Sequence, residues 1–157
     1  MTGALIFAAK MALAGLPNIE PVSLLVMVCA VAFGAGAVYP IAVYVLLEIS
    51  VFGPHLWSIS YLYVWGLLAL AAWLLRDMES PLGWAVLSGG FGLLFGALCA
   101  PVYLITGGPS FALSWWISGI PFDLAHCVGN FSLALVLFRP LRSIALRLRR
   151  HFRAGGE

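Results

Sequence analysis

Apolar residues fill this chain in long runs, and the breaks between the runs are short and rich in Gly, Pro or charged residues. This pattern predicts helices that end at each break. The expected helices cover residues 4–16, 21–34, 39–52, 56–75, 81–104 and 110–138. The stretch 21–52 is the ambiguous one, because it is too long for one membrane span and short for two. We expect two short helices around Gly34-Ala35-Gly36, with one long helix plus a re-entrant piece as the alternative.

Composition places these helices in a membrane. Of the 157 residues, 63% are hydrophobic and 9% are charged, against about 25% charged in soluble domains. A spanning helix takes about 20 residues, so the chain has room for about six spans and for no separate catalytic domain. The sequence therefore predicts an all-α fold, an integral membrane bundle of six short transmembrane helices that forms a single membrane domain over residues 1–157.

Basic residues give the expected orientation. Arginines follow the last apolar run, among them Arg142, Arg147, Arg149, Arg150 and Arg153. By the positive-inside rule they place a C-terminal basic tail, residues 140–157, in the cytoplasm, and Arg76, two spans earlier, agrees. Six spans then put both termini inside. The tail also has the character of a surface helix on anionic lipid, and its concentrated charge gives no indication of nucleic-acid binding.

Polar residues in the last helix are the first candidate site. Asp123, His126 and Asn130 are spaced by three and four residues, which puts them on one helical face, with Trp116 further up that face. Ionisable groups inside a membrane are costly and often functional. Three interpretations stay open: a structural pair that holds helices together, a ligand or ion site, and a catalytic acid–base pair. No metal site is expected, and the three cysteines show no CxxC spacing.

A second polar and aromatic cluster is expected at the outer face. Asn18 and Glu20 lie in the first turn, and Trp57, Tyr61 and Trp65 form a stripe with a spacing of four at the start of the fourth helix. An interfacial aromatic belt is the ordinary explanation, and the wall of a pocket for a flat heterocycle is the functional one. Lys10 and Glu48 are further charges within apolar helices, and the sequence assigns neither of them.

Small residues recur every four positions on two helices. Ala4, Ala8 and Ala12 make a smooth ridge on the first helix, and a second ridge lies on the fifth helix. Such ridges let helices approach closely in lipid. Packing inside the bundle explains both, and docking of a partner protein is the alternative for the first. The second ridge consists of Ser88, Gly92, Gly96 and Ala100.

Two runs carry a family resemblance. They are Leu16-Pro17-Asn18-Ile19-Glu20-Pro21-Val22, after the alanine ridge, and Ser118-Gly119-Ile120-Pro121-Phe122-Asp123-Leu124-Ala125-His126-Cys127-Val128-Gly129-Asn130-Phe131. With six short spans, the chain resembles the substrate-binding S component of an energy-coupling factor (ECF) transporter over nearly its whole length.

The resemblance implies a multi-pass protein of a prokaryotic plasma membrane. It would bind a vitamin or similar small heterocycle near the outer face and dock on a transmembrane T component that works with two ATPases. Ala4, Ala8 and Ala12 become the docking ridge under this resemblance. The implied substrate-binding residues are Asn18, Glu20, Trp57, Tyr61, Trp116, Asp123, His126 and Asn130.

The expected role is binding without catalysis, and no cofactor is expected. The chain contains no Walker motif, so it does not hydrolyse ATP itself. Acids at Glu20 and Asp123 favour a ligand with hydrogen-bond donors or a positive charge. Two alternatives remain: an intramembrane enzyme that uses Asp123 and His126 as an acid–base pair, and a structural membrane subunit.

Overall fold

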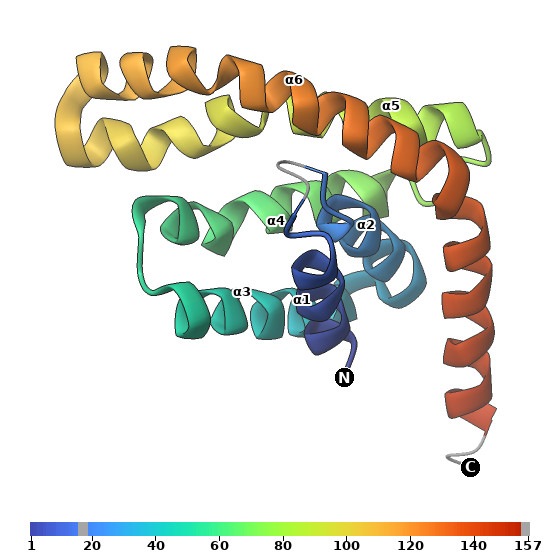
Figure 1. The fold of residues 1–157 in the computed structure, drawn as a ribbon. Coiled ribbons are helices and arrows are strands. Elements are labelled where there is room, and N and C mark those ends of the chain that lie inside the picture. The colour runs from blue at the N-terminus through green and yellow to red at the C-terminus, as the bar shows by residue number, and fades with distance from the viewer. Residues whose placement is uncertain (16–18, 155–157) are drawn as a thin grey trace.

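The computed structural model describes residues 1–15 and 19–154, and within these ranges every regular element is a helix. The helices form two groups in space: α5 and α6 lie together along one side, and α1 to α4 pack beneath them (Figure 1). In chain order the elements are α1 (Thr2–Ala12), α2 (Val22–Phe33), a short 3-10 turn η1 (Gly34–Ala37), α3 (Val38–Phe52), α4 (Leu56–Leu74), α5 (Pro81–Leu93) and α6 (Phe95–Ala154).

Three continuous helical stretches are long and apolar enough to cross a membrane, and α1 is a shorter apolar helix. The all-helical class is therefore confirmed, and the long apolar helices are compatible with an integral membrane protein. The expectation of six separate helices is not confirmed, because the described residues form four continuous stretches: η1 joins α2 to α3, and α6 continues through Gly108, where the expected fifth helix ends and the sixth begins. The three long stretches are Val22–Phe52, Leu56–Leu74 and Pro81–Arg150.

Glycines mark the points where these stretches change direction. Gly34 (φ 60°) ends α2, and Gly108 (φ 79°, ψ 179°) is a non-helical residue inside α6. Positive φ is a conformation that glycine adopts without the steric penalty of a Cβ. At Gly108 the chain doubles back, so that the short first segment of α6, residues 95–107, runs beside the segment that follows it (Figure 1). The break predicted at Gly107-Gly108-Pro109 is thus a reversal within one helical stretch.

The ridge on α5 is an internal packing surface, as one interpretation of the sequence proposed. A Cβ built on Gly92 would lie 2.8 Å from the carbonyl oxygen of His126, and one on Gly96 would lie 2.5 Å from a carboxylate oxygen of Asp123. The absence of side chains at Gly92 and Gly96 therefore allows α5 and the start of α6 to approach the returning half of α6 closely. This contact fixes the position of the helix face that bears Asp123 and His126.

The C-terminal part of α6 makes hydrogen bonds to the α4–α5 turn and to the end of α2. Arg139 donates to the carbonyl of Glu79 (2.9 Å), Arg142 donates to that of Arg76 (3.1 Å), and Arg149 donates to that of Ala32 (2.7 Å). The expected basic tail is therefore a continuing helix up to Ala154. Its arginines gather at the end of the molecule that holds the α4–α5 turn, whereas the α3–α4 turn and the Gly108 reversal lie at the other end (Figure 1).

Candidate functional site

A buried ion pair links α1 to α3. Lys10 Nζ donates to Glu48 Oε2 at 2.8 Å and lies 3.8 Å from Glu20 Oε2. The Glu48 side chain is fully buried, while the side chains of Lys10 and Glu20 are 18% and 17% exposed. Three charged side chains from separate parts of the chain therefore meet at a site that is partly exposed at the protein surface.

Aromatic rings surround the Lys10 ammonium. Its nitrogen lies 5.7 Å from the ring centre of Phe52, 5.6 Å from that of Trp57 and 5.5 Å from that of Tyr61. All three distances are within the range of cation–π attraction. The spacing-of-four stripe on α4 is confirmed as a packed row, because Tyr61 contacts both Trp57 (5.4 Å between ring centres) and Trp65 (5.2 Å). We call Lys10, Glu20, Glu48 and the rings of Phe52, Trp57 and Tyr61 the charge cage.

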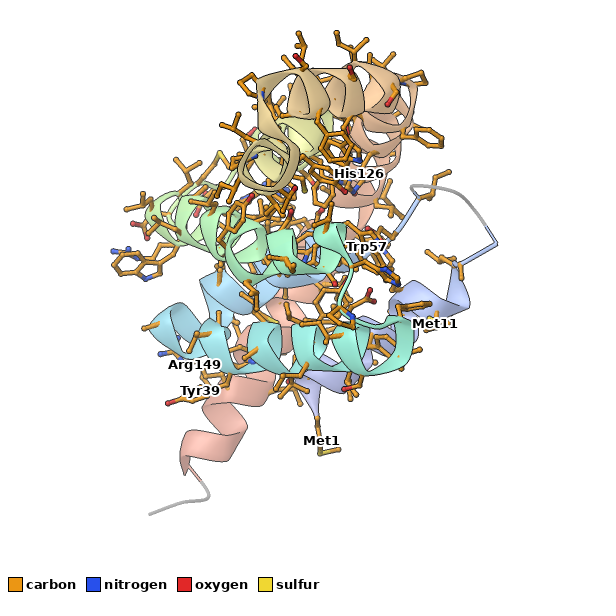
Figure 2. The ribbon with its side chains drawn as sticks, turned by 90° about the vertical axis from the view of Figure 1, so that its left-hand side faces the viewer. Met1, Met11, Tyr39, Trp57, His126 and Arg149 are labelled. Atoms are coloured by element: carbon orange, nitrogen blue, oxygen red, sulfur yellow. The ribbon has the colours of Figure 1, made fainter. Side chains whose placement is uncertain are left out.

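His126 borders the charge cage from α6. Its Nε2 atom lies 4.0 Å from Glu20 Oε1, and its ring packs edge-on against Phe95 with 4.9 Å between centres. Phe95 in turn contacts Tyr61, with 6.1 Å between ring centres. In the view of Figure 2, Trp57 falls between His126 of α6 and Met11 of α1, on the side away from Arg149. His126 and Glu20 are thus two of the predicted residues that the fold brings together.

Asp123 and Asn130 lie on the same buried face of α6 as His126, as the spacing predicted. Asp123 is 6% exposed, His126 is 3% exposed and Asn130 is 1% exposed. Their partners differ from those of His126. Asp123 Oδ1 accepts a hydrogen bond from the Gly96 backbone N–H (3.1 Å), and Asn130 Nδ2 donates to Ser23 Oγ (2.9 Å). These contacts connect helices to one another and give no argument for an Asp123–His126 acid–base pair.

Two predicted binding residues do not join this group. Trp116 is 39% exposed, and its neighbour Trp115 takes the inward position, where it stacks on Tyr103 with 3.8 Å between ring centres. Asn18 lies outside the described residues.

Several buried polar atoms of this region have no hydrogen-bond partner among the described residues. They include Glu48 Oε1, His126 Nε2 and Tyr44 Oη around the charge cage, and Asp123 Oδ2 nearby on α6. Buried polar groups in proteins are almost always satisfied, and leaving one unsatisfied costs about 1–3 kcal/mol. Of these atoms, Glu48 Oε1 and Asp123 Oδ2 act only as acceptors when the carboxyl is ionised, whereas the Tyr44 hydroxyl and the His126 ring nitrogen can also donate.

Electrostatics around the charge cage are unbalanced. One lysine faces two carboxylates, Glu20 and Glu48. Burial raises the pKa of Glu20 above its ordinary value of 4.5, although the nearby Lys10 opposes this shift. The region therefore attracts a further positive charge or a proton.

A separate apolar groove of about 610 Å³ lies between α3 and α4, with Tyr61 on its wall. Small and aliphatic side chains make up most of its lining, among them Ala42, Gly66 and Ala69. It offers no charged group to a ligand, and Tyr61 is the one residue of the charge cage in its lining. Among residues 1–15 and 19–154, no group of three His, Cys, Asp or Glu could hold a metal ion.

The chain matches no family model, and no curated protein or solved structure matches it. The site therefore stands on its own geometry. Sequence reasoning left Lys10 and Glu48 unassigned, yet both are central to the charge cage. The signal was present, because each is a lone charge in an apolar helix, a position that is expensive in a membrane unless the charge finds a partner.

Proposed function

We propose that this protein is a membrane-embedded substrate-binding subunit for uptake of a small, ring-containing micronutrient, of the ECF S-component type. The observation that carries the proposal is the charge cage, where Lys10, Glu20 and Glu48 meet inside a wall of aromatic rings. Aromatic walls with a few convergent polar groups are the usual form of a small-molecule site.

A purely structural ion pair explains less of the geometry. A buried pair gains stability only when its remaining polar atoms are also satisfied, and here Glu48 Oε1 has no partner among the described residues. The partial exposure of Lys10 and Glu20 also supports a role in binding, because it gives a solute a route to the cage.

The proposal includes six short membrane helices. The break at Gly34 and the reversal at Gly108 divide the two longer stretches into four segments, α4 is the fifth, and α1 is a sixth helix whose 11 residues cover only part of the bilayer. With Arg76, Arg139 and Arg142 at one end of the bundle, the positive-inside rule puts that end and the C-terminus in the cytoplasm. The charge cage then lies in the outer half, as expected for a site loaded from outside.

The exposure of the alanine ridge supports the proposal that α1 docks on a partner protein. Ala4, Ala8 and Ala12 are exposed, while Gly3 and Ile6 on the same helix are buried against the bundle. The ridge therefore faces away from the protein's own core. We propose that it receives a T component through close helix packing, and that two ATPases drive the assembled transporter.

The test is recovery of a ligand from the purified protein. Native mass spectrometry of the detergent-solubilised chain should reveal one retained small molecule, and that molecule should stabilise the protein against heat. Glu48→Gln should abolish the retention. Glu79→Gln is the matched control, because Glu79 is an exposed glutamate in the α4–α5 turn. A chain without a retained molecule, and without stabilisation by a panel of vitamins and nucleobases, would contradict the proposal.

A further inference from the structure

We infer that the charge cage recognises an organic ammonium group, and that Lys10 occupies the ammonium position in the structure described here. The inference rests on the proposed function, since it assigns a ligand class to the same site. It adds that the ligand carries a positive charge next to a hydrocarbon or ring body, and that this charge replaces the Lys10 head group when the ligand binds.

The surroundings of Lys10 Nζ define the recognition chemistry. The nitrogen is 2.8 Å from one carboxylate, 3.8 Å from a second, and within 5.7 Å of three ring centres. Aromatic faces combined with negative charge are the arrangement that proteins use to bind ammonium ligands. The two glutamates would repel an anionic ligand, and a neutral ligand that displaced Lys10 would leave both glutamates without a cation.

Lys10 is suited to leave. Its side chain is 18% exposed and lies near the end of α1, at Ala12. A lysine has a long flexible stem and can move its ammonium toward a polar surface while the stem stays on apolar neighbours. A ligand cation that takes its place keeps Glu48 paired with a positive charge.

Chemical rescue tests the inference on the full chain. Lys10→Ala removes the ammonium and most of the stem, and should lower the melting temperature of the protein in detergent. Propylammonium chloride at millimolar concentration should restore most of the loss, whereas equal concentrations of sodium chloride or 1-propanol should not. Wild-type protein should respond at least ten-fold more weakly, because Lys10 already fills the position.

Two further variants make the result specific. Adding Glu48→Gln to Lys10→Ala should remove the rescue, and adding Glu79→Gln should leave it intact. If Lys10→Ala does not fold, Lys10→Met keeps a stem of the same length and loses only the ammonium group, and ammonium chloride becomes the matching probe. Rescue by 1-propanol equal to that by propylammonium, or the absence of rescue in both variants, would overturn the inference.

The outcomes also separate this inference from the proposed function. A retained ligand that proves neutral or anionic leaves the binding role standing and overturns the ammonium assignment. Specific ammonium rescue in a chain that retains no micronutrient supports the ammonium site and contradicts the uptake role.

Discussion

Replacing single glycines of α5 tests how closely α5 packs against α6, the contact that positions His126. A Cβ at Gly92 would lie 2.8 Å from the carbonyl carbon and oxygen of His126 and 2.9 Å from the amide nitrogen of Cys127. These are backbone atoms of α6, so they cannot rotate away and the helices must separate. Gly90 is the matched control, because a Cβ there meets nothing within 4 Å.

The expected energies have opposite signs. Alanine is about 1 kcal/mol better than glycine in a helix interior, so Gly90→Ala should stabilise the protein by about 0.5–1 kcal/mol. At Gly92 the same gain is outweighed by overpacking, which costs about 1–3 kcal/mol in closely packed cores and falls at the high end here because the contacts are with backbone. We expect Gly92→Ala to be destabilised by roughly 1–2 kcal/mol.

Denaturation of both variants in the same detergent gives the comparison, with helicity by circular dichroism as the readout. Ligand retention gives a second one, since separating α5 from α6 moves His126 relative to Glu20. If Gly92→Ala proves as stable as Gly90→Ala, then α5 and α6 are not packed as closely as described and the argument for the position of His126 fails.

Three other predictions concern separate parts of the molecule. Asn130→Ala should destabilise the fold by about 1 kcal/mol, and a double-mutant cycle with Ser23→Ala in the denaturation assay should show positive coupling between the two side chains; additive losses would show that the hydrogen bond contributes nothing. Because the pKa of Glu20 is raised in the folded protein, its contribution to stability is full below pH 4.5 and is lost as the pH rises through the higher folded value. Melting curves of Glu20→Gln should lack that decline, and parallel pH profiles would refute the assignment. Ala8→Trp should prevent co-purification with the T component while leaving thermal stability unchanged. The control Ala125→Trp, at an exposed small residue of α6, should co-purify normally. Equal assembly of both variants would show that the alanine ridge is not part of the interface.

Local pattern predicted those features that depend on neighbouring residues. The end of α3 at Phe52 and the start of α4 at Leu56 follow from Gly53-Pro54 and match the expected limits. The shared burial of Asp123, His126 and Asn130 follows from helical periodicity alone, and so does the aromatic row on α4. These features are set by spacing along one helix, and spacing is visible in a sequence.

Features that depend on how helices pack could not be predicted from spacing along one helix. Lys10 and Glu48 are 38 residues apart, and no periodicity pairs two charges on different helices. Trp116 was expected in the site, but the rotation of α6 turns Trp115 inward instead. The turn at Leu94, which divides the expected helix 81–104 into α5 and the start of α6, was also missed, since it has no Gly-Pro signal.

The short helix α1 carries both the alanine ridge and Lys10 of the charge cage. At about 1.5 Å per residue, its 11 residues extend for roughly 16 Å, about half of the hydrocarbon thickness of a bilayer. The alanine ridge occupies its exposed face, and Lys10 on the same helix holds Glu48 by a hydrogen bond of 2.8 Å. A partner that shifts α1 therefore acts directly on the Lys10–Glu48 pair. Binding energies are reciprocal, so a cation that displaces Lys10 must change the affinity of the ridge for its partner by the same factor by which the partner changes the affinity for the cation. Lys10→Ala removes the connecting group, and in that variant the two affinities should become independent.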